Sequence, residues 1–103
     1  GGLTAGTTYT TSKGAMTALT LSIARESAPF GVTANGIAPA YIKTPMITDF
    51  LSEEQKSELL NQIPVGRFCE AEEVAHVVRF LASPLSGFIT GEIIDINGGL
   101  HMD

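Results

Sequence analysis

Apolar residues recur at helical spacing in three parts of this sequence, with small or polar residues between them. The first apolar stripe consists of Met16, Leu19 and Ile23. It predicts a helix from about Thr10 to Ala28, which Pro29 and Gly31 end. A second band on the same segment is made of small residues, Ala15, Ala18 and Ser22. The helix therefore offers two faces for packing.

Two shorter helices are predicted further along the chain. Ser52 and Gln55 form a capping box, which begins an amphipathic helix that runs to about Gln62. The next helix carries negative charge in its first turn, where the helix dipole favours it, at Glu70, Glu72 and Glu73. Its buried stripe is expected to comprise Val74, Val77, Val78 and Leu81. Ser83 and Pro84 end this helix.

Residues 32–38 form a short apolar run that lacks the polar alternate face of a half-exposed strand, and residues 92–96 form the final predicted strand. Such a run predicts a strand that is buried on both sides in a parallel sheet. Residues 1–8 are rich in Gly and Thr and are expected to form a loop, and residues 97–99 have the composition of a turn. Residues 39–45 follow the first strand at its carboxyl end, where open α/β sheets bind ligands, although a simple connector would look the same.

The order helix, strand, two helices, strand predicts an α/β fold in which two parallel strands are joined by a right-handed crossover. Two strands buried on both faces need further strands beside them. We therefore expect this chain to be part of a larger doubly wound parallel-sheet domain, and to expose strand edges and apolar helix faces when taken alone.

Composition and charge limit the number of domains and the classes of partner that this chain can have. With 103 residues, 44% of them hydrophobic and 17% charged, the chain is one folded domain at most. Its net charge is −5 and its six Lys and Arg residues are scattered, which argues against binding to nucleic acid or an anionic membrane. A single cysteine, Cys69, fits a reducing compartment, and no secretory signal or apolar span is present, so the chain is expected to be cytoplasmic. His76 and His101 do not have the spacing of metal ligands, and no metal site is predicted.

Tyr9 and Lys13 are the residues best suited to chemistry. Residues four apart on a helix project from the same face, so their side chains can reach one shared point. A neighbouring ammonium favours the phenolate form of a tyrosine, which suits proton transfer near neutral pH. On its own this spacing is common on solvated helix faces. Small neighbours leave room for a ligand or a closely packed helix around the pair, and they include Thr7, Thr8, Ser12, Gly14 and Ala15.

Five motifs, in order, resemble the C-terminal part of a short-chain dehydrogenase/reductase, and the resemblance covers essentially the whole chain. They are the Tyr-x-x-x-Lys at Tyr9 and Lys13, the strand 32–38 ending at Pro39, the Ile-x-Thr at Ile42 and Thr44, Thr90-Gly91, and the tail Asn97-Gly98-Gly99. The fold that this implies is the C-terminal part of a doubly wound, parallel-sheet Rossmann fold, with residues 1–103 as one segment of a single oxidoreductase domain.

The resemblance implies hydride transfer between NAD or NADP and a small-molecule carbonyl or secondary alcohol. Tyr9 would protonate the carbonyl oxygen, and Lys13 would hold the nicotinamide ribose and tune the tyrosine. The Ile42 backbone and the Thr44 side chain would hold the nicotinamide carboxamide, and Pro39 would shape the turn. Family members usually have Gly where this chain has Ala40, and a Cβ there adds bulk near the ring and would strain a positive φ.

Residues 46–63 resemble the mobile substrate lid of the family. Its apolar residues are Met46, Ile47, Phe50 and Leu51. They suit an acyl chain or a hydrophobic ketone better than a sugar, or they simply pack the lid helix down. Arg67-Phe68, the acidic helix start and the tail are similar to 3-oxoacyl-[acyl-carrier-protein] reductases and to their sugar- and alcohol-oxidising relatives.

The family's glycine-rich cofactor loop and catalytic Ser would lie upstream of Gly1, so the chain alone is expected to be inactive without the N-terminal half of the same protein. The resemblance also implies a homodimer or homotetramer, in which the first helix packs between subunits. An alternative from a different class is a non-catalytic oligomerisation module, for which the small band at Ala15, Ala18 and Ser22 would serve subunit packing.

Overall fold

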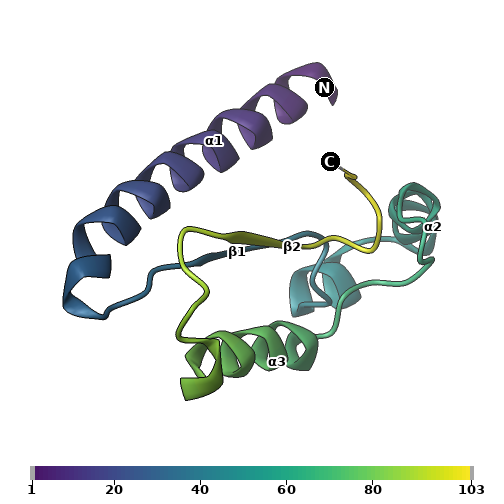
Figure 1. Ribbon diagram of the computed structural model, residues 1–103. Coiled ribbons are helices and arrows are strands. Elements are labelled where there is room, and N and C mark those ends of the chain that lie inside the picture. Colours follow the sequence, from purple (N-terminus) through teal and green to yellow (C-terminus); the bar gives the residue numbers. More distant parts are fainter. Residues whose placement is uncertain (1, 103) are drawn as a thin grey trace. The chain divides into compact units, whose positions relative to one another are not determined.

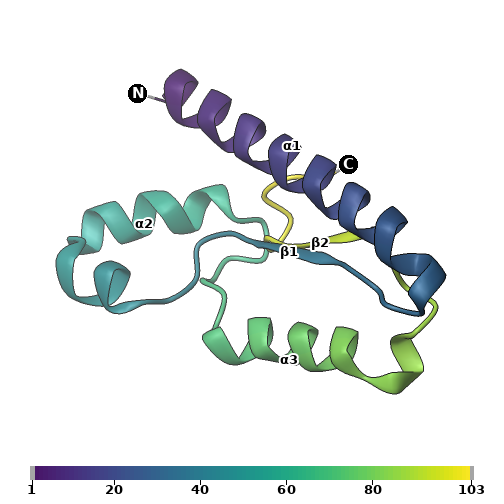
Figure 2. The same cartoon turned by 90° about the vertical axis from the view of Figure 1, so that its left-hand side faces the viewer.

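A computed structural model describes the backbone of residues 2–102 and the side chains of residues 9–102. Along the chain it contains, in order, α1 (Gly2–Ser27), β1 (Gly36–Pro39), α2 (Glu53–Gln62), α3 (Ala71–Ala82) and β2 (Ile93–Ile96) (Figure 1). A π-helical segment, Met46–Phe50, precedes α2 (Figure 2). The chain forms two compact units. The first contains residues up to Ala38 together with Phe80–Ile94, and the second contains Pro39–Arg79 with the residues from Asp95 onward.

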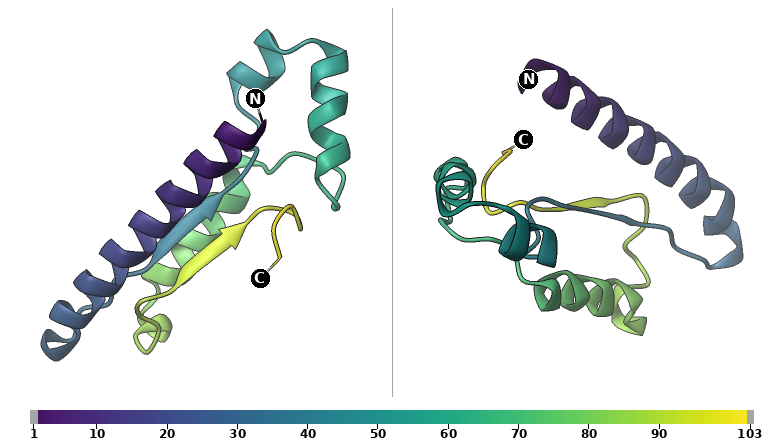
Figure 3. Two further views of the ribbon diagram at one scale, coloured as in Figure 1. Left: turned by 90° about the horizontal axis from the view of Figure 1, so that it is seen from above. Right: turned by 180° about the vertical axis from the view of Figure 1, so that it is seen from behind.

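The two strands form a small parallel sheet (Figure 3). Hydrogen bonds flank the pairing at both ends, from the Gly36 N–H to the Glu92 carbonyl at 2.8 Å and from the Ala40 N–H to the Ile96 carbonyl at 2.9 Å. The helix and strand order and the parallel pairing agree with the α/β fold that the sequence predicted.

The predicted loop at residues 1–8 is wrong, because α1 already begins at Gly2. Gly and Thr have low helix propensity, but extending an existing helix by one residue adds a hydrogen bond without repeating the cost of nucleation. The other end is as predicted. Pro29 lies in a 3₁₀ turn after Ser27, and Gly31 adopts a left-handed φ of 74° while its N–H donates to the Ala28 carbonyl.

Of the apolar stripe expected on α1, only Met16 lies on the buried face. Leu19 is 62% exposed and Ile23 44% exposed, whereas Thr20 and Ala24 are buried. The reason is close approach to the chain that returns as the strands. A Cβ placed on Gly36 would lie 3.4 Å from the Thr20 hydroxyl oxygen, and one on Gly91 would lie 3.8 Å from the Ala24 Cβ. Small side chains permit this spacing, while Leu19 and Ile23 lie on the exposed side of α1. The small band is also exposed, at Ala15, Ala18 and Ser22.

The first strand is shorter than predicted, since regular pairing begins at Gly36 rather than at residue 32. Just before Gly36, the side chain of Asn35 replaces some of the backbone hydrogen bonds between the two strands. The Asn35 amide nitrogen donates to the Ile89 carbonyl at 3.0 Å, and its oxygen accepts from the Glu92 N–H at 3.0 Å. Asn35 therefore fixes the approach of both strands within the first unit, a role that the sequence did not reveal.

Most other local predictions for the second unit are confirmed. Ser52 and Gln55 form both hydrogen bonds of the capping box of α2. Gly98 and Gly99 have φ of 59° and 89°, and the Asn97 side chain accepts from the Gly99 N–H. One prediction for α3 is wrong. None of its predicted stripe is fully buried, since Val74, Val77 and Leu81 are half-buried and Val78 is 50% exposed.

The expected exposure of apolar surface is also observed. The largest exposed fractions among big apolar side chains are those of Phe30, Leu85, Phe88 and Phe50, and Leu85 and Phe88 are almost fully exposed. The buried apolar residues of the described chain are few, namely Ala24, Ala38 and Ile63. A two-stranded sheet therefore leaves much of its apolar surface uncovered, as the sequence indicated. Within the described residues no helix is long and apolar enough to cross a membrane.

Candidate active site

Tyr9 and Lys13 lie one turn apart on α1, and both side chains are half-buried. They continue the same face as the buried Thr20 and Ala24, since the half-buried Met16 and Thr17 lie between them. The Tyr9 hydroxyl oxygen has less than 1 Å² of exposed surface. The backbone at Lys13 is also held, because its carbonyl accepts a hydrogen bond from the Thr17 hydroxyl at 2.9 Å. The predicted pair thus shares one half-buried helix face, on which the Tyr9 hydroxyl oxygen is shielded from water.

The loop after β1 has a different strained residue from the one that the sequence suggested. Ala40 continues the strand pairing, with its N–H on the Ile96 carbonyl, and it does not adopt a positive φ. The left-handed conformation falls on Tyr41, with φ of 54°. A Cβ at position 40 is therefore compatible with the backbone, and the strain that the sequence suggested for Ala40 is absent. At Tyr41 the conformation costs about 1 kcal/mol, and the hydroxyl is held by the Gln62 side chain at 3.2 Å.

Ile42 is anchored on one side and open on the other. It forms a parallel bridge with Cys69, in which the Lys43 N–H donates to the Cys69 carbonyl at 2.7 Å and the Cys69 N–H donates to the Tyr41 carbonyl at 3.1 Å. Successive peptide groups of an extended chain point to opposite sides, so the N–H and C=O of Ile42 itself point away from Cys69. Neither makes a hydrogen bond to any residue that the structure describes. A carboxamide ligand, which has one acceptor and two donors, matches this pair.

Thr44 lies two residues before the segment 46–63, which the sequence predicted to be a lid. The Thr44 carbonyl accepts from the N–H groups of Ile47 and Thr48, both at 2.9 Å. Met46 and Phe50 are 70% and 80% exposed, while Ile47 and Leu51 are half-buried. Met46 and Phe50 therefore do not pack the segment down, and they leave an apolar surface on it.

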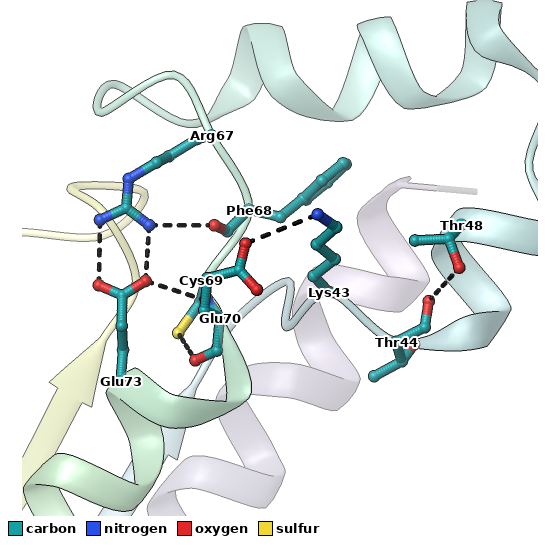
Figure 4. Close-up of polar contacts among 8 residues, drawn as sticks. All are labelled: Lys43, Thr44, Thr48, Arg67, Phe68, Cys69, Glu70 and Glu73. Carbon is teal, nitrogen blue, oxygen red and sulfur yellow. Dashed lines mark hydrogen bonds and ion pairs between the residues drawn. The ribbon is translucent and has the colours of Figure 1, made fainter.

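Sequence reasoning did not single out an ion pair between Arg67 and Glu73, which lies beside Cys69 (Figure 4). The Arg67 guanidinium makes two bonds to the Glu73 carboxylate, at 2.6 and 3.0 Å, and a third to the Phe68 carbonyl at 3.2 Å. The same carboxylate accepts from the Glu70 N–H at 3.0 Å. Glu73 at the third position of α3 is the sequence signal that could have revealed this back-bonding.

Electrostatics keep the pair ionised. The hydrogen bond from Arg67, with help from the Glu70 N–H, lowers the pKa of Glu73 from 4.5 to about 2. The same interaction raises the pKa of Arg67 above its ordinary value. Partial burial, followed by the Glu73 charge, raises the pKa of the Cys69 thiol, which is therefore protonated at neutral pH. These three side chains line part of a cavity of about 230 Å³ in the second unit.

The chain matches known proteins over nearly all of its length. A family model described as Enoyl-(Acyl carrier protein) reductase covers residues 2–101. The chain belongs to this family, a group of short-chain dehydrogenases/reductases. The resemblance drawn from its motifs is thereby confirmed.

Several curated relatives are named 3-oxoacyl-[acyl-carrier-protein] reductase FabG. The protein from Aquifex aeolicus (strain VF5) is 50% identical over 92 residues, which is 89% of this chain and 37% of the relative. The Vibrio cholerae protein (serotype O1) is 45% identical over 94 residues, 91% of this chain and 38% of the relative. That from Haemophilus influenzae is 42% identical over 96 residues, 93% of this chain and 39% of the relative. The chain thus spans less than two-fifths of the length of these relatives.

These relatives are reductases by name, so the comparison gives no support to the alternative of a non-catalytic oligomerisation module. The site residues of this chain lie in both compact units, with Tyr9 and Lys13 in the first and the loop from Pro39 to Thr44 in the second.

Proposed function

We propose that this chain supplies the proton-transfer pair, part of the nicotinamide site and the substrate lid of an NAD- or NADP-dependent 3-oxoacyl thioester reductase. The observation that carries the proposal is the pair Tyr9 and Lys13 on one half-buried face of α1, in a chain 42–50% identical to proteins named 3-oxoacyl-[acyl-carrier-protein] reductase. The remaining cofactor contacts and the catalytic Ser are assigned to another segment of the complete protein, and a homodimer or homotetramer stays a prediction from the family.

The residues present fit the nicotinamide end of such a cofactor. The outward N–H and C=O of Ile42 complement a carboxamide, and the exposed Thr44 adds a hydroxyl two residues further on. Pro39 and Ala40 continue the strand into this loop and hold its start against Ile96. When bound, a reduced nicotinamide supplies the hydride.

Tyr9 and Lys13 supply the proton and the charge. Reduction of a 3-oxo group leaves negative charge on its oxygen, which a phenol can protonate as the hydride arrives at the carbon. A nearby ammonium stabilises the phenolate that remains and can donate hydrogen bonds to a ribose hydroxyl at the same time. A site shielded from bulk water strengthens both interactions.

The experiment compares substrates in the complete protein. Oxidation of NADH and of NADPH is followed with a 3-oxoacyl thioester, with a trans-2-enoyl thioester of equal length, and with simple hydrophobic ketones. We expect turnover with the 3-oxoacyl thioester to exceed that with the enoyl thioester by at least about a hundred-fold, since protonation by Tyr9 serves a carbonyl oxygen. Preference for the enoyl thioester would redirect the proposal toward the reaction in the family model's description. No turnover with any carbonyl would refute it.

The exposed apolar lid residues predict a preference for long acyl chains. Replacing both Met46 and Phe50 with serine should raise the KM for a 3-oxoacyl thioester of ten or more carbons by about ten-fold, and leave that for a four-carbon substrate within two-fold. The double variant removes two large apolar side chains that face solvent. Val65→Ser is the matched control, because Val65 is 59% exposed but lies outside the lid. Equal effects on both substrates would show that the segment does not contact the acyl chain.

A further inference from the structure

We propose that Arg67 and Glu73 are positioning residues for the nicotinamide carboxamide, and that they act through Cys69 on the Ile42 peptide groups. This inference rests on the proposed function. Neither side chain touches the open N–H and C=O of Ile42. Instead, the ion pair fixes the residues on both sides of Cys69, and Cys69 fixes the peptide groups on both sides of Ile42.

The first step is the hold on Cys69. Its preceding neighbour is tied by the bond from Arg67 to the Phe68 carbonyl, and its following neighbour is tied by the bond from the Glu70 N–H to Glu73. Because one carboxylate accepts from both Arg67 and Glu70, it joins the chain before and after Cys69 to the first turn of α3. A bidentate pair of this kind restricts orientation as well as distance.

The second step is the hold of Cys69 on the loop. The Cys69 carbonyl accepts from the Lys43 N–H, and the Cys69 N–H donates to the Tyr41 carbonyl. These two partners belong to the two peptide groups that contain Ile42. The planes of these peptide groups therefore determine where the N–H and C=O of Ile42 point. An ion pair between Lys43 and Glu70 at 3.6 Å adds a weaker link, since both side chains are more than half exposed.

The chain contains a matched ion pair for comparison. Arg79 and Glu72 both lie on α3 and are 2.6 Å apart, but no described contact joins them to the loop that holds Ile42. Neutralising Glu72 thus costs the helix one ion pair without loosening Cys69. Differences between the two carboxylate variants isolate the effect on the loop from the effect on α3.

The test measures binding to the complete protein of two ligands, the reduced dinucleotide and ADP-ribose, which lacks the nicotinamide. Glu73→Gln should weaken dinucleotide binding by about three- to ten-fold, as for one lost charged hydrogen bond at a partly exposed site, and leave ADP-ribose binding unchanged. Glu72→Gln should change neither by more than two-fold. Glu73→Asp, which keeps the charge, should restore part of the affinity, and kcat at saturating dinucleotide should fall less than kcat/KM for the dinucleotide.

Provided that the wild-type protein still reduces its substrate, two results would overturn the inference. One is that Glu73→Gln weakens the binding of the dinucleotide and of ADP-ribose equally, and the other is that Glu73→Gln and Glu72→Gln have the same small effect. If the wild-type protein binds no dinucleotide, the proposed function fails, and the inference fails with it. A melting temperature within a few degrees of wild type for each variant confirms that the folded protein is being compared.

Discussion

Replacing Tyr9 with phenylalanine is expected to lower kcat of the complete protein for a 3-oxoacyl thioester by about a thousand-fold or more. The change removes the Tyr9 hydroxyl, whose oxygen is shielded from water, and keeps the aromatic ring on the half-buried face of α1. General acid catalysis typically contributes a factor of about 10² to 10⁴, so loss of the proton donor accounts for an effect of this size. The affinity for the dinucleotide should stay within about five-fold, because a tyrosine hydroxyl contributes at most one of its hydrogen bonds.

Ser12→Ala is the control for this variant. It removes a hydroxyl from the same part of α1, but the Ser12 side chain is exposed. Steady-state kinetics should show activity within about two-fold of wild type, as for most exposed substitutions. A Tyr9→Phe protein with more than a tenth of wild-type kcat would remove Tyr9 from the mechanism, whereas a loss in Ser12→Ala of the same size would point to a general sensitivity of this turn.

Replacing Gly36 with valine should destabilise the complete protein by about 1–3 kcal/mol, with a larger effect if the neighbours cannot move. The first atom of a side chain at Gly36 would lie 2.6 Å from the Ile93 Cδ1 and 3.4 Å from the hydroxyl oxygen of the buried Thr20. Ile93 can rotate away, but the two methyl groups of valine then meet the face of α1. The free energy of unfolding, measured by urea denaturation, reports the loss.

Gly14→Val is the matched control, because nothing lies within 4 Å of a Cβ built on Gly14. Valine and glycine differ by only a few tenths of a kcal/mol in helix propensity, so this variant should be close to neutral. Equal stability of the Gly36 and Gly14 variants would show that α1 does not pack closely on the start of β1 in the complete protein.

Local signals in the sequence predicted local structure well. The capping box at Ser52 and Gln55, the stop at Pro29 and Gly31, and the Asn97-Gly98-Gly99 turn each depend on a few neighbouring residues, and each is present. The parallel strand pair and the helix order also followed from the pattern of apolar runs. These features can be predicted without knowing which other parts of the protein pack against them.

Features that depend on distant partners were not predictable in the same way. Thr20 rather than Leu19 is buried on α1 because Thr20 lies against Gly36, which comes later in the chain. Asn35 replaces part of the strand ladder only because residues 89–92 pass beside it.

The candidate site shows the same division. Tyr9 and Lys13 were identified from their spacing and do share a half-buried face. Ile42 was identified from its motif, and its own N–H and C=O make no hydrogen bond to any described residue. The Arg67 and Glu73 pair was missed because its significance depends on the bridge between Ile42 and Cys69, which are 27 positions apart in the chain. Tyr41 was missed because left-handed φ values are rare outside glycine.

The Asn35 bridge has a consequence for synthesis on the ribosome. Asn35 and Glu92 are separated by 57 positions. At about 5–20 residues per second, translation takes roughly 3–11 s to deliver the second partner after the first. During that interval α1 can form from local contacts, but β1 has no β2 to pair with, and its polar backbone edge is available to other nascent chains. Molecular chaperones that shield an unpaired strand for some seconds would therefore improve the yield of folded protein.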